Sequence, residues 1–268
     1  MSEAGGRLPA VGRTAVGVAA LRALESSRAD RLFEDHWAGA FYLAGRAALG
    51  NENRLEGGLG EVFAQQVAVR TRFFDDYVRG AHQVVLLAAG LDARAYRLDW
   101  PEDARLYELD LPDVLRFKDE VLDRHHAEPK CERIGVPADL RADWGSRLVA
   151  AGFDPQRPTT WLAEGLMVYL EHDEAARLLE EVTRLSAPGS RVSFEHRPDG
   201  ESDGLLQRAR RVGGPVIELW RGGLGTDAPR WLTAHGWQPR TFTVNDLAAT
   251  YGRPSLDSTN GGFVVATR

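Results

Sequence analysis

Short apolar runs and segments of helical periodicity alternate along most of the chain. From Gln83 onward, each run typical of a buried strand is followed by a segment with apolar residues at helical spacing. The predicted strands span 83–88, 105–110, 132–136, 159–164 and 191–195. This alternation predicts an α/β fold with a mainly parallel sheet covered by helices.

The two ends of the chain follow other patterns. Before the first strand, the sequence predicts helices over 14–26, 30–49 and 61–78, so the N-terminal quarter is helical. Near the C-terminus, the closely spaced strands 238–244 and 262–267 predict an antiparallel addition to the sheet edge. The glycine-containing segment of about 199–226 is predicted to be a cap insert. We therefore expect one compact unit, with a helical region over residues 1–80 packed on a core over residues 81–268.

Composition and charge limit the possible functions. The 268 residues are 43% hydrophobic and carry a formal net charge of -6, which is typical of a globular domain and argues against a general nucleic-acid binder. The single cysteine, Cys131, excludes an intrachain disulfide, and the pair His125-His126, in a charged segment typical of a helix end, is not followed by a flanking set of metal ligands. No run approaches the roughly 20 apolar residues of a membrane span, and no apolar signal core precedes Gly12. We expect a cytoplasmic protein with no metal, no membrane partner and no nucleic-acid partner.

A tight turn after the first strand, followed by an acid at the end of the second, indicates a nucleoside site. Small residues over 88–90 would let backbone N–H groups approach a ligand, and Asp110, about 20 residues on, is placed to accept hydrogen bonds from both ribose hydroxyls. The turn has one glycine, Gly90, where dinucleotide turns have three, and Asp92 would repel a pyrophosphate. Two alternatives remain: a tight turn of no special function, and Asp110 as an N-cap of the helix near Pro112.

Two further acids follow predicted strands. Asp139 and Leu140 come after the third strand, where an acid can bond an exocyclic adenine amine and an apolar side chain can support the ring. Asp139 as a plain turn residue is the alternative. Glu164 ends the fourth strand, and a buried acid there is costly unless it is paired. A sulfonium or amino group of a cofactor would stabilise Glu164, and so would structural pairing with an arginine.

These motifs together resemble the leucine carboxyl methyltransferase family, in particular its actinobacterial branch of S-adenosyl-L-methionine-dependent methyltransferases. The resemblance extends from about Gly12 to Arg268, and its most specific parts are "LLAAGLDARAYRL", "YELD" and "WLAEGLMVYL". It implies a seven-stranded Rossmann-like methyltransferase sheet with helices on both faces, an antiparallel strand near the edge and a helical N-terminal lid over residues 1–80. It also implies S-adenosyl-L-methionine as the cofactor. Ala88 stands where many members have glycine, and the 199–226 segment belongs to this chain alone, so the resemblance carries over no substrate.

The resemblance also implies residue roles. Arg70 matches the arginine that grips the cofactor carboxylate, with Arg72 as a neighbouring alternative, and Arg22 falls where eukaryotic members have a lysine. Asp110 matches the ribose acid, and Glu164 matches the acid near the cofactor amine. The cofactor-binding residues expected in this way are Arg22, Arg70, Ala88, Gly90, Asp110, Leu111, Asp139, Leu140 and Glu164.

The expected reaction is methyl transfer to oxygen. We predict a carboxylate or hydroxyl acceptor on a small molecule or peptide, in secondary metabolism. At the mouth of the site, His196 and Tyr169 are the candidate catalytic groups, because a hydroxyl acceptor needs its proton removed. Arg13 and Arg197 are the candidates that would hold an acceptor carboxylate. A capped strand end for His196 and core packing for Tyr169 are the alternatives.

Two other classes of function remain open. An NAD(P)-dependent oxidoreductase would need more glycine in the turn and a Tyr/Lys or His couple, whereas the lysines here, Lys118 and Lys130, lie at no plausible site. A non-catalytic nucleoside-binding protein would keep Asp110, Asp139 and Glu164 without turnover. The sequence gives no information on the oligomeric state.

Overall fold

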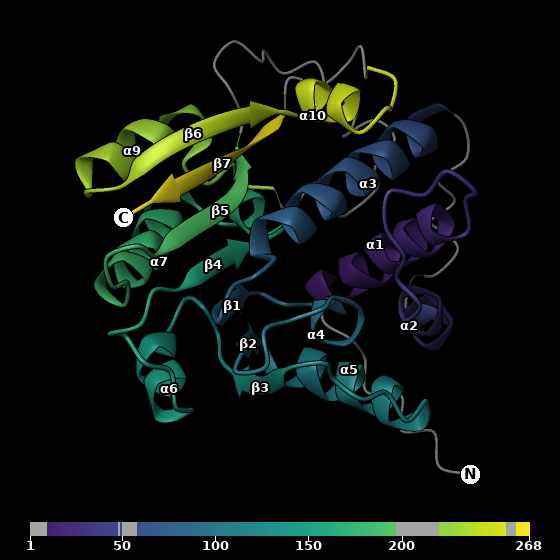
Figure 1. Ribbon diagram of the computed structural model, residues 1–268, viewed down its shortest axis with the longest axis horizontal. Helices are drawn as coiled ribbons and strands as arrows, with labels where there is room; N and C mark the ends of the chain where they lie inside the picture. Colours follow the sequence, from purple (N-terminus) through teal and green to yellow (C-terminus); the bar gives the residue numbers. More distant parts are fainter. Residues whose placement is uncertain (1–9, 48, 50–57, 197–219, 256–260) are drawn as a thin grey trace.

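A seven-stranded sheet forms the centre of the protein. The computed structural model describes residues 10–47, 49, 58–196, 220–255 and 261–268. The strands are β1 (Gln83–Leu87), β2 (Arg105–Asp110), β3 (Glu132–Pro137), β4 (Thr160–Ala163), β5 (Arg191–His196), β6 (Gln238–Thr243) and β7 (Gly262–Thr267). Their order in the sheet is β3-β2-β1-β4-β5-β7-β6 (Figure 1). The pairs from β3 to β5 are parallel, and β7 runs antiparallel to both β5 and β6. The predicted α/β fold, with its seven strands and antiparallel addition, is confirmed.

Helices cover both faces of the sheet because side chains on a strand alternate between its two sides. On β1, Val84 and Leu86 pack in one core with residues of α3 (Gly58–Val78), α5 (Pro112–Arg124) and α10 (Val244–Thr250). Val85 and Leu87 pack in a second core on the opposite face. That face is covered by α6 (Trp144–Ala150), α7 (His172–Arg184) and α9 (Ala228–Ala234). Both faces are apolar, as expected for a mainly parallel sheet.

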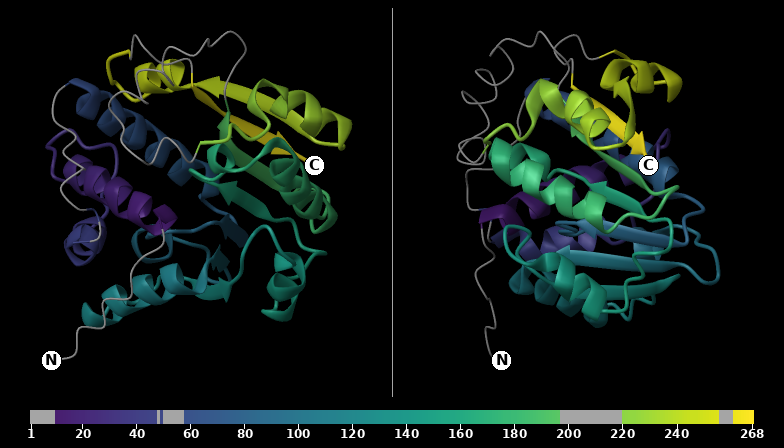
Figure 2. Two further views of the ribbon diagram at one scale, coloured as in Figure 1. Left: turned by 180° about the vertical axis from the view of Figure 1, so that it is seen from behind. Right: turned by 90° about the vertical axis from the view of Figure 1, so that its left-hand side faces the viewer.

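The N-terminal helices add a further layer. Helix α1 (Ala10–Ser26) contacts α3 and α2 (Ala38–Gly45), and Figures 1 and 2 place α1 and α2 at the side of the molecule away from α9. The predicted helix over 30–49 was too long, since α2 begins only at Ala38. The cause is Asp35, whose buried carboxylate accepts hydrogen bonds from the backbone N–H groups of Trp37 (3.1 Å) and Ala38 (3.0 Å). The chain before Asp35 is thereby held outside the helix.

The predicted division into a lid over 1–80 and a core over 81–268 stays a prediction. Helix α3 belongs to the covering of the sheet, because Phe73 stacks on Phe263 of β7 and Phe74 contacts the same ring edge to face. Most of the predicted cap insert at 199–226 lies outside the described residues. Its final part is described, and it ends in a short 3-10 helix, η4 (Gly225–Asp227). None of the described helices is both long and apolar enough to cross a membrane.

Candidate functional site

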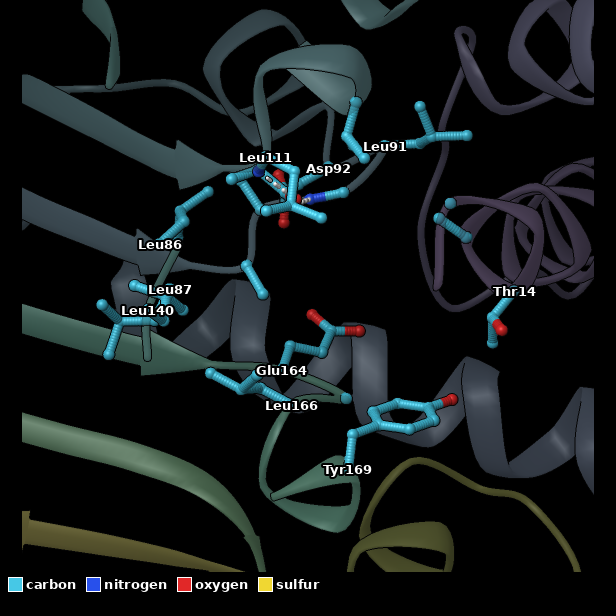
Figure 3. Close-up of a pocket in the computed structure, with 18 of the residues that line it drawn as sticks. Thr14, Leu86, Leu87, Leu91, Asp92, Leu111, Leu140, Glu164, Leu166 and Tyr169 are labelled. Carbon is cyan, nitrogen blue, oxygen red and sulfur yellow. Dashed lines mark hydrogen bonds between the residues drawn. The ribbon is translucent and has the colours of Figure 1, made fainter. Parts of the chain in front are cut away.

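A cavity of about 320 Å³ lies at the carboxyl ends of β1, β2, β3 and β4. The strand order reverses direction between β1 and β4, and such a switch point is where open α/β sheets bind ligands. The volume falls within the range of small-molecule and cofactor sites. Thr14, Ala15 and Val18 of α1 form the wall opposite the strands. In Figure 3, Glu164 points into the cavity from the strand side, Thr14 lies on the α1 side, and Tyr169 lies between them.

Ten of the residues predicted from the sequence line this one cavity. They are Arg22, Arg70, Ala88, Gly90, Asp110, Leu111, Asp139, Leu140, Glu164 and Tyr169. The described part of the chain contains no cluster of acidic, histidine or cysteine side chains suited to a metal ion. The polar groups of the described cavity wall include carboxylates, guanidinium groups and backbone N–H groups, which lie between apolar side chains.

The turn after β1 and Asp110 at the end of β2 are joined by a hydrogen bond. Ala88 and Gly90 both have left-handed backbones, with φ of 55° and 52°, so the chain turns sharply and presents its N–H groups. Asp110 accepts the Gly90 N–H on Oδ2 at 2.6 Å and the Leu111 N–H on Oδ1 at 2.7 Å. Burial raises the pKa of Asp110, although these two N–H groups oppose the shift. Each oxygen keeps a second lone pair for a ligand hydroxyl. The N-cap alternative for Asp110 is wrong, because the N-cap position of α5 is Leu111 and no side chain caps that helix.

Asp139 lies beyond the tip of β3, beside the apolar side chain of Leu140. Its carboxylate accepts hydrogen bonds from Arg141 Nε at 3.0 Å and Arg141 Nη2 at 2.7 Å, and these bonds lower its pKa. It also accepts the Arg141 backbone N–H at 3.0 Å, so it is a turn residue as well. Asp139 is therefore an ionised acceptor at the edge of the cavity.

Glu164, at the tip of β4, is paired with two arginines. Its Oε1 lies 3.0 Å from Arg70 Nε, and its Oε2 lies 2.8 Å from Arg94 Nη1. Burial would raise the pKa of Glu164, but Arg94 and Arg70 bring it below its usual value. Pairing with arginine, one of the two alternatives from the sequence, is thus confirmed. It does not exclude a cofactor amine, because Glu164 also faces the cavity.

Sequence reasoning missed Arg94. This residue is in the short helix α4 (Arg94–Arg97), only 1% exposed, and it also pairs with Asp92 and with Asp75 at 2.8 Å. The sequence features that could have identified it are the acid of the "GLDAR" segment, Asp92, and the Asp75-Asp76 pair, since buried acids require cations.

Arg22 and Arg70, the two arginines predicted to bind the cofactor carboxylate, have different partners. Arg22 Nε is 3.0 Å from Asp35 Oδ2, and its Nη2 donates to the carbonyl of Leu91. Arg70 reaches Glu164 and, through Nη1, Glu195 Oε1 at 3.3 Å. Arg72, the alternative to Arg70, pairs with Asp76 at 2.9 Å and is not among the described residues of the cavity wall.

The acceptor-side predictions are only partly described. Tyr169 is in the 3-10 helix η2 (Met167–Tyr169), where burial raises its pKa and its hydroxyl is near Trp220 and Thr14. His196 ends β5 opposite Gly262 of β7 and is not among the described wall residues. Arg197 and the side chain of Arg13 lie outside the described residues. The roles of all four stay predictions.

Comparison with solved structures defines the fold class. A DUF574-family protein of Streptomyces avermitilis superimposes with a TM-score of 0.59 at 12% identity, covering 95% of this chain and 97% of that one. A Thermobifida fusca protein described as a methyltransferase gives a TM-score of 0.58 at 16% identity, covering 98% and 96%. At such identities the likeness concerns the fold alone, which is that of the Rossmann-like methyltransferases.

Sequence comparison defines the family. Residues 15–183 match the sequence model of the family described as leucine carboxyl methyltransferase. A protein of Parafrankia sp., assigned to the S-adenosyl-L-methionine-dependent methyltransferases, is 48% identical over 272 residues, which cover 96% of this chain and 87% of the relative. A Frankia alni protein with the same assignment is 48% identical over 268 residues, covering 96% and 94%. The chain belongs to the leucine carboxyl methyltransferase family, and the predicted resemblance is confirmed.

Proposed function

We propose that the protein is an S-adenosyl-L-methionine-dependent O-methyltransferase whose acceptor is a carboxylate or hydroxyl of a small molecule or peptide. The observation that carries the proposal is Asp110, which is held at the tip of β2 by the Gly90 and Leu111 N–H groups and faces the cavity. A buried carboxylate with free lone pairs suits two vicinal ribose hydroxyls. The assignments of the close relatives support the same cofactor.

The residues around the cavity fit the parts of this cofactor. Leu111 and Leu140 offer apolar surfaces for an adenine ring, and the ionised Asp139 is an acceptor for its amine. Glu164 is an acid suited to an α-ammonium group, and Arg70 has N–H groups suited to an α-carboxylate. Bound S-adenosyl-L-methionine would supply a methyl group activated by its sulfonium.

The chain would contribute orientation and exclusion of water. The wall of α1 encloses the side of the cavity opposite the strands, and Tyr169 of η2 adds to the lining, which would limit hydrolysis and align the acceptor. Each arginine in the described wall already has an acid partner: Arg22 with Asp35, Arg70 with Glu164, and Arg141 with Asp139. A carboxylate acceptor would therefore need another cation, and Arg13 and Arg197 are the candidates from the sequence.

An acceptor assay tests the proposed chemistry. The protein is incubated with S-adenosyl-L-methionine carrying a labelled methyl group and with a panel of small carboxylates, phenols, alcohols and peptides. We expect label on an acceptor oxygen and an equal amount of S-adenosylhomocysteine. Mild alkali distinguishes the two proposed acceptors, because it releases the label from a methyl ester and not from an ether. Transfer of the label to nitrogen, carbon or sulfur would contradict O-methyl transfer.

A further inference from the structure

A continuous series of ion pairs runs behind the cavity from α1 to β5. Its successive contacts are Arg22–Asp35 (3.0 Å), Asp35–Arg97 (3.9 Å), Arg97–Asp75 (2.5 Å), Asp75–Arg94 (2.8 Å), Arg94–Glu164 (2.8 Å), Glu164–Arg70 (3.0 Å) and Arg70–Glu195 (3.3 Å). Asp92 joins it as a further partner of Arg94. The side chains are nearly buried at the α1 end, and exposure rises to 28% at Glu195.

Among the described residues, this series carries one more acid than base. Its four arginines are Arg22, Arg70, Arg94 and Arg97, and its five acids are Asp35, Asp75, Asp92, Glu164 and Glu195. An unbalanced charge in a buried site is costly, so the series favours one more positive charge or one bound proton. The neighbouring buried cluster is balanced within the same described part of the chain, because Lys118 and Arg133 face Glu108 and Asp119.

The surplus acid is Glu195, at the end of the series. Among the described residues, its one cationic partner is Arg70 of α3, which it shares with Glu164 at the end of β4. Both of its oxygens accept the Gly165 N–H at 2.8 Å, while Tyr169 faces it from η2 and its neighbour on β7 is Phe263. Burial raises the pKa of Glu195, Arg70 opposes this shift, and Glu164 adds to it. Burial acts on Glu164 and Asp92 as well, but arginines lower the pKa of both, so of these three acids Glu195 is the one that most readily holds a proton.

Cofactor and product differ by one charge in the proposed reaction. Both carry an α-carboxylate and an α-ammonium group, but the cofactor has a sulfonium and the product a neutral thioether. On methyl transfer, sulfur keeps the electron pair of the broken bond, and the acceptor oxygen forms the new bond to the methyl carbon. The positive charge leaves the sulfur, and the surplus acid behind the cavity is again without a counter-charge.

Building on the proposed function, we infer that Glu195 is a specificity residue that distinguishes the charged cofactor from the neutral product. Glu195 loses its proton to solvent when S-adenosyl-L-methionine binds, and it takes a proton from solvent when S-adenosylhomocysteine is left in the site. It acts through Arg70 and Glu164, which line the cavity, and makes no contact with the ligand itself. Its charge therefore favours cofactor over product and assists product release.

Calorimetric titrations with both ligands test this inference. They are run from about pH 5 to pH 8, in buffers of different ionisation enthalpy, so that proton release is measured directly. We expect S-adenosyl-L-methionine to release part of a proton and to bind more tightly as pH rises, because above its pKa Glu195 has no proton left to lose. S-adenosylhomocysteine should show neither effect. The ratio of the two affinities is compared below about pH 7, where both ligands keep a charged α-ammonium and α-carboxylate group.

The variant Glu195→Gln keeps an oxygen for the Gly165 N–H but carries no charge. We expect it to abolish the difference in proton release and to lower the ratio of cofactor to product affinity by about fivefold. Glu180→Gln, an exposed residue of α7, is the matched control and should change neither.

The titrations distinguish three outcomes that would contradict the inference or the proposed function. If Glu195→Gln weakens both ligands equally, Glu195 only positions Arg70, and the inference is wrong. If proton release is unchanged in the variant, another group titrates, and the inference is again wrong. If the wild-type protein binds neither ligand, the proposed function itself fails.

Discussion

Replacing Asp110 by alanine is expected to weaken the binding of S-adenosylhomocysteine by about 100-fold, which corresponds to roughly two charge-assisted hydrogen bonds at 1.5–3 kcal/mol each, less the gain from no longer burying the acid. The carboxylate is 8% exposed, and each of its oxygens has one N–H partner and one lone pair left for a ribose hydroxyl. Removing it also releases the Gly90 N–H that shapes the turn. Isothermal titration calorimetry measures the loss directly.

Two companion variants make this result specific. Asp110→Asn keeps one acceptor oxygen and should lose only about tenfold. Asp113→Ala removes an acid three residues further on that is exposed and pairs with Arg116 at 2.9 Å, so affinity should be unchanged. A folded Asp110→Ala protein that binds with wild-type affinity would mean that the nucleoside pocket has been misplaced.

The substitution Arg94→Met should lower the free energy of unfolding by about 3–5 kcal/mol, since it leaves buried acids without their cation. Asp75 keeps Arg97 at 2.5 Å, and Glu164 keeps Arg70 at 3.0 Å. Among the described hydrogen bonds, Asp92 keeps that from the backbone N–H of residue 94, at 2.7 Å, and its remaining cations, such as Lys118, are more distant, so most of the cost falls on this acid. Urea denaturation at neutral pH measures the effect.

The pH dependence of this loss has a definite sign. Although burial would raise it, Arg94 and other cations lower the pKa of Asp92 to about 2. In the wild-type protein, Asp92 therefore contributes stability above the unfolded pKa of about 3.9, and that stability disappears as pH falls towards the folded value. In the variant, Asp92 gains by protonation, so the difference between the two proteins should shrink as pH falls below about 5.

Two controls accompany Arg94→Met. Arg116→Met, an exposed position on α5, should change stability by less than about 0.5 kcal/mol. Adding Asp92→Asn to Arg94→Met should restore part of the loss, because the two residues share one interaction. An Arg94→Met protein with the wild-type denaturation midpoint would contradict a buried, charged network.

The sheet and much of the cavity could be predicted because they depend on local patterns. Apolar runs such as 83–87 specify buried strands, and parallel strands bring their carboxyl ends to one edge. An acid directly after such a run, as at Asp110, Asp139 or Glu164, must therefore lie near the turn at Gly90. The structure places all four in the wall of one cavity.

The charge network could not be predicted because its pairings are long-range. Arg94 meets Asp75 across 19 positions and Glu164 across 70, and both contacts depend on how α3 packs on the sheet. The start of α2 was missed for a related reason, since the aromatic spacing of 33–42 is helical but the carboxylate of Asp35 starts the helix later.

The end of β5 shows a limit of a different kind. Adjacent strand residues point to opposite sides, so a boundary error of one residue exchanges their roles. From the sequence, Glu195 and His196 both lie at the mouth, and His196 is the residue expected to face the acceptor, which stays a prediction. The structure adds that Glu195 contacts Arg70 of the cavity wall and lies opposite Phe263 of β7.

We expect the cavity at the tips of β1, β2 and β4 to bind an S-adenosyl ligand. Parallel calorimetric titrations of the wild-type protein with S-adenosylhomocysteine and with NAD test this expectation most directly. We predict saturable binding of S-adenosylhomocysteine at one site per chain and no heat of binding with NAD. Saturable binding of NAD, with none of S-adenosylhomocysteine, would contradict it.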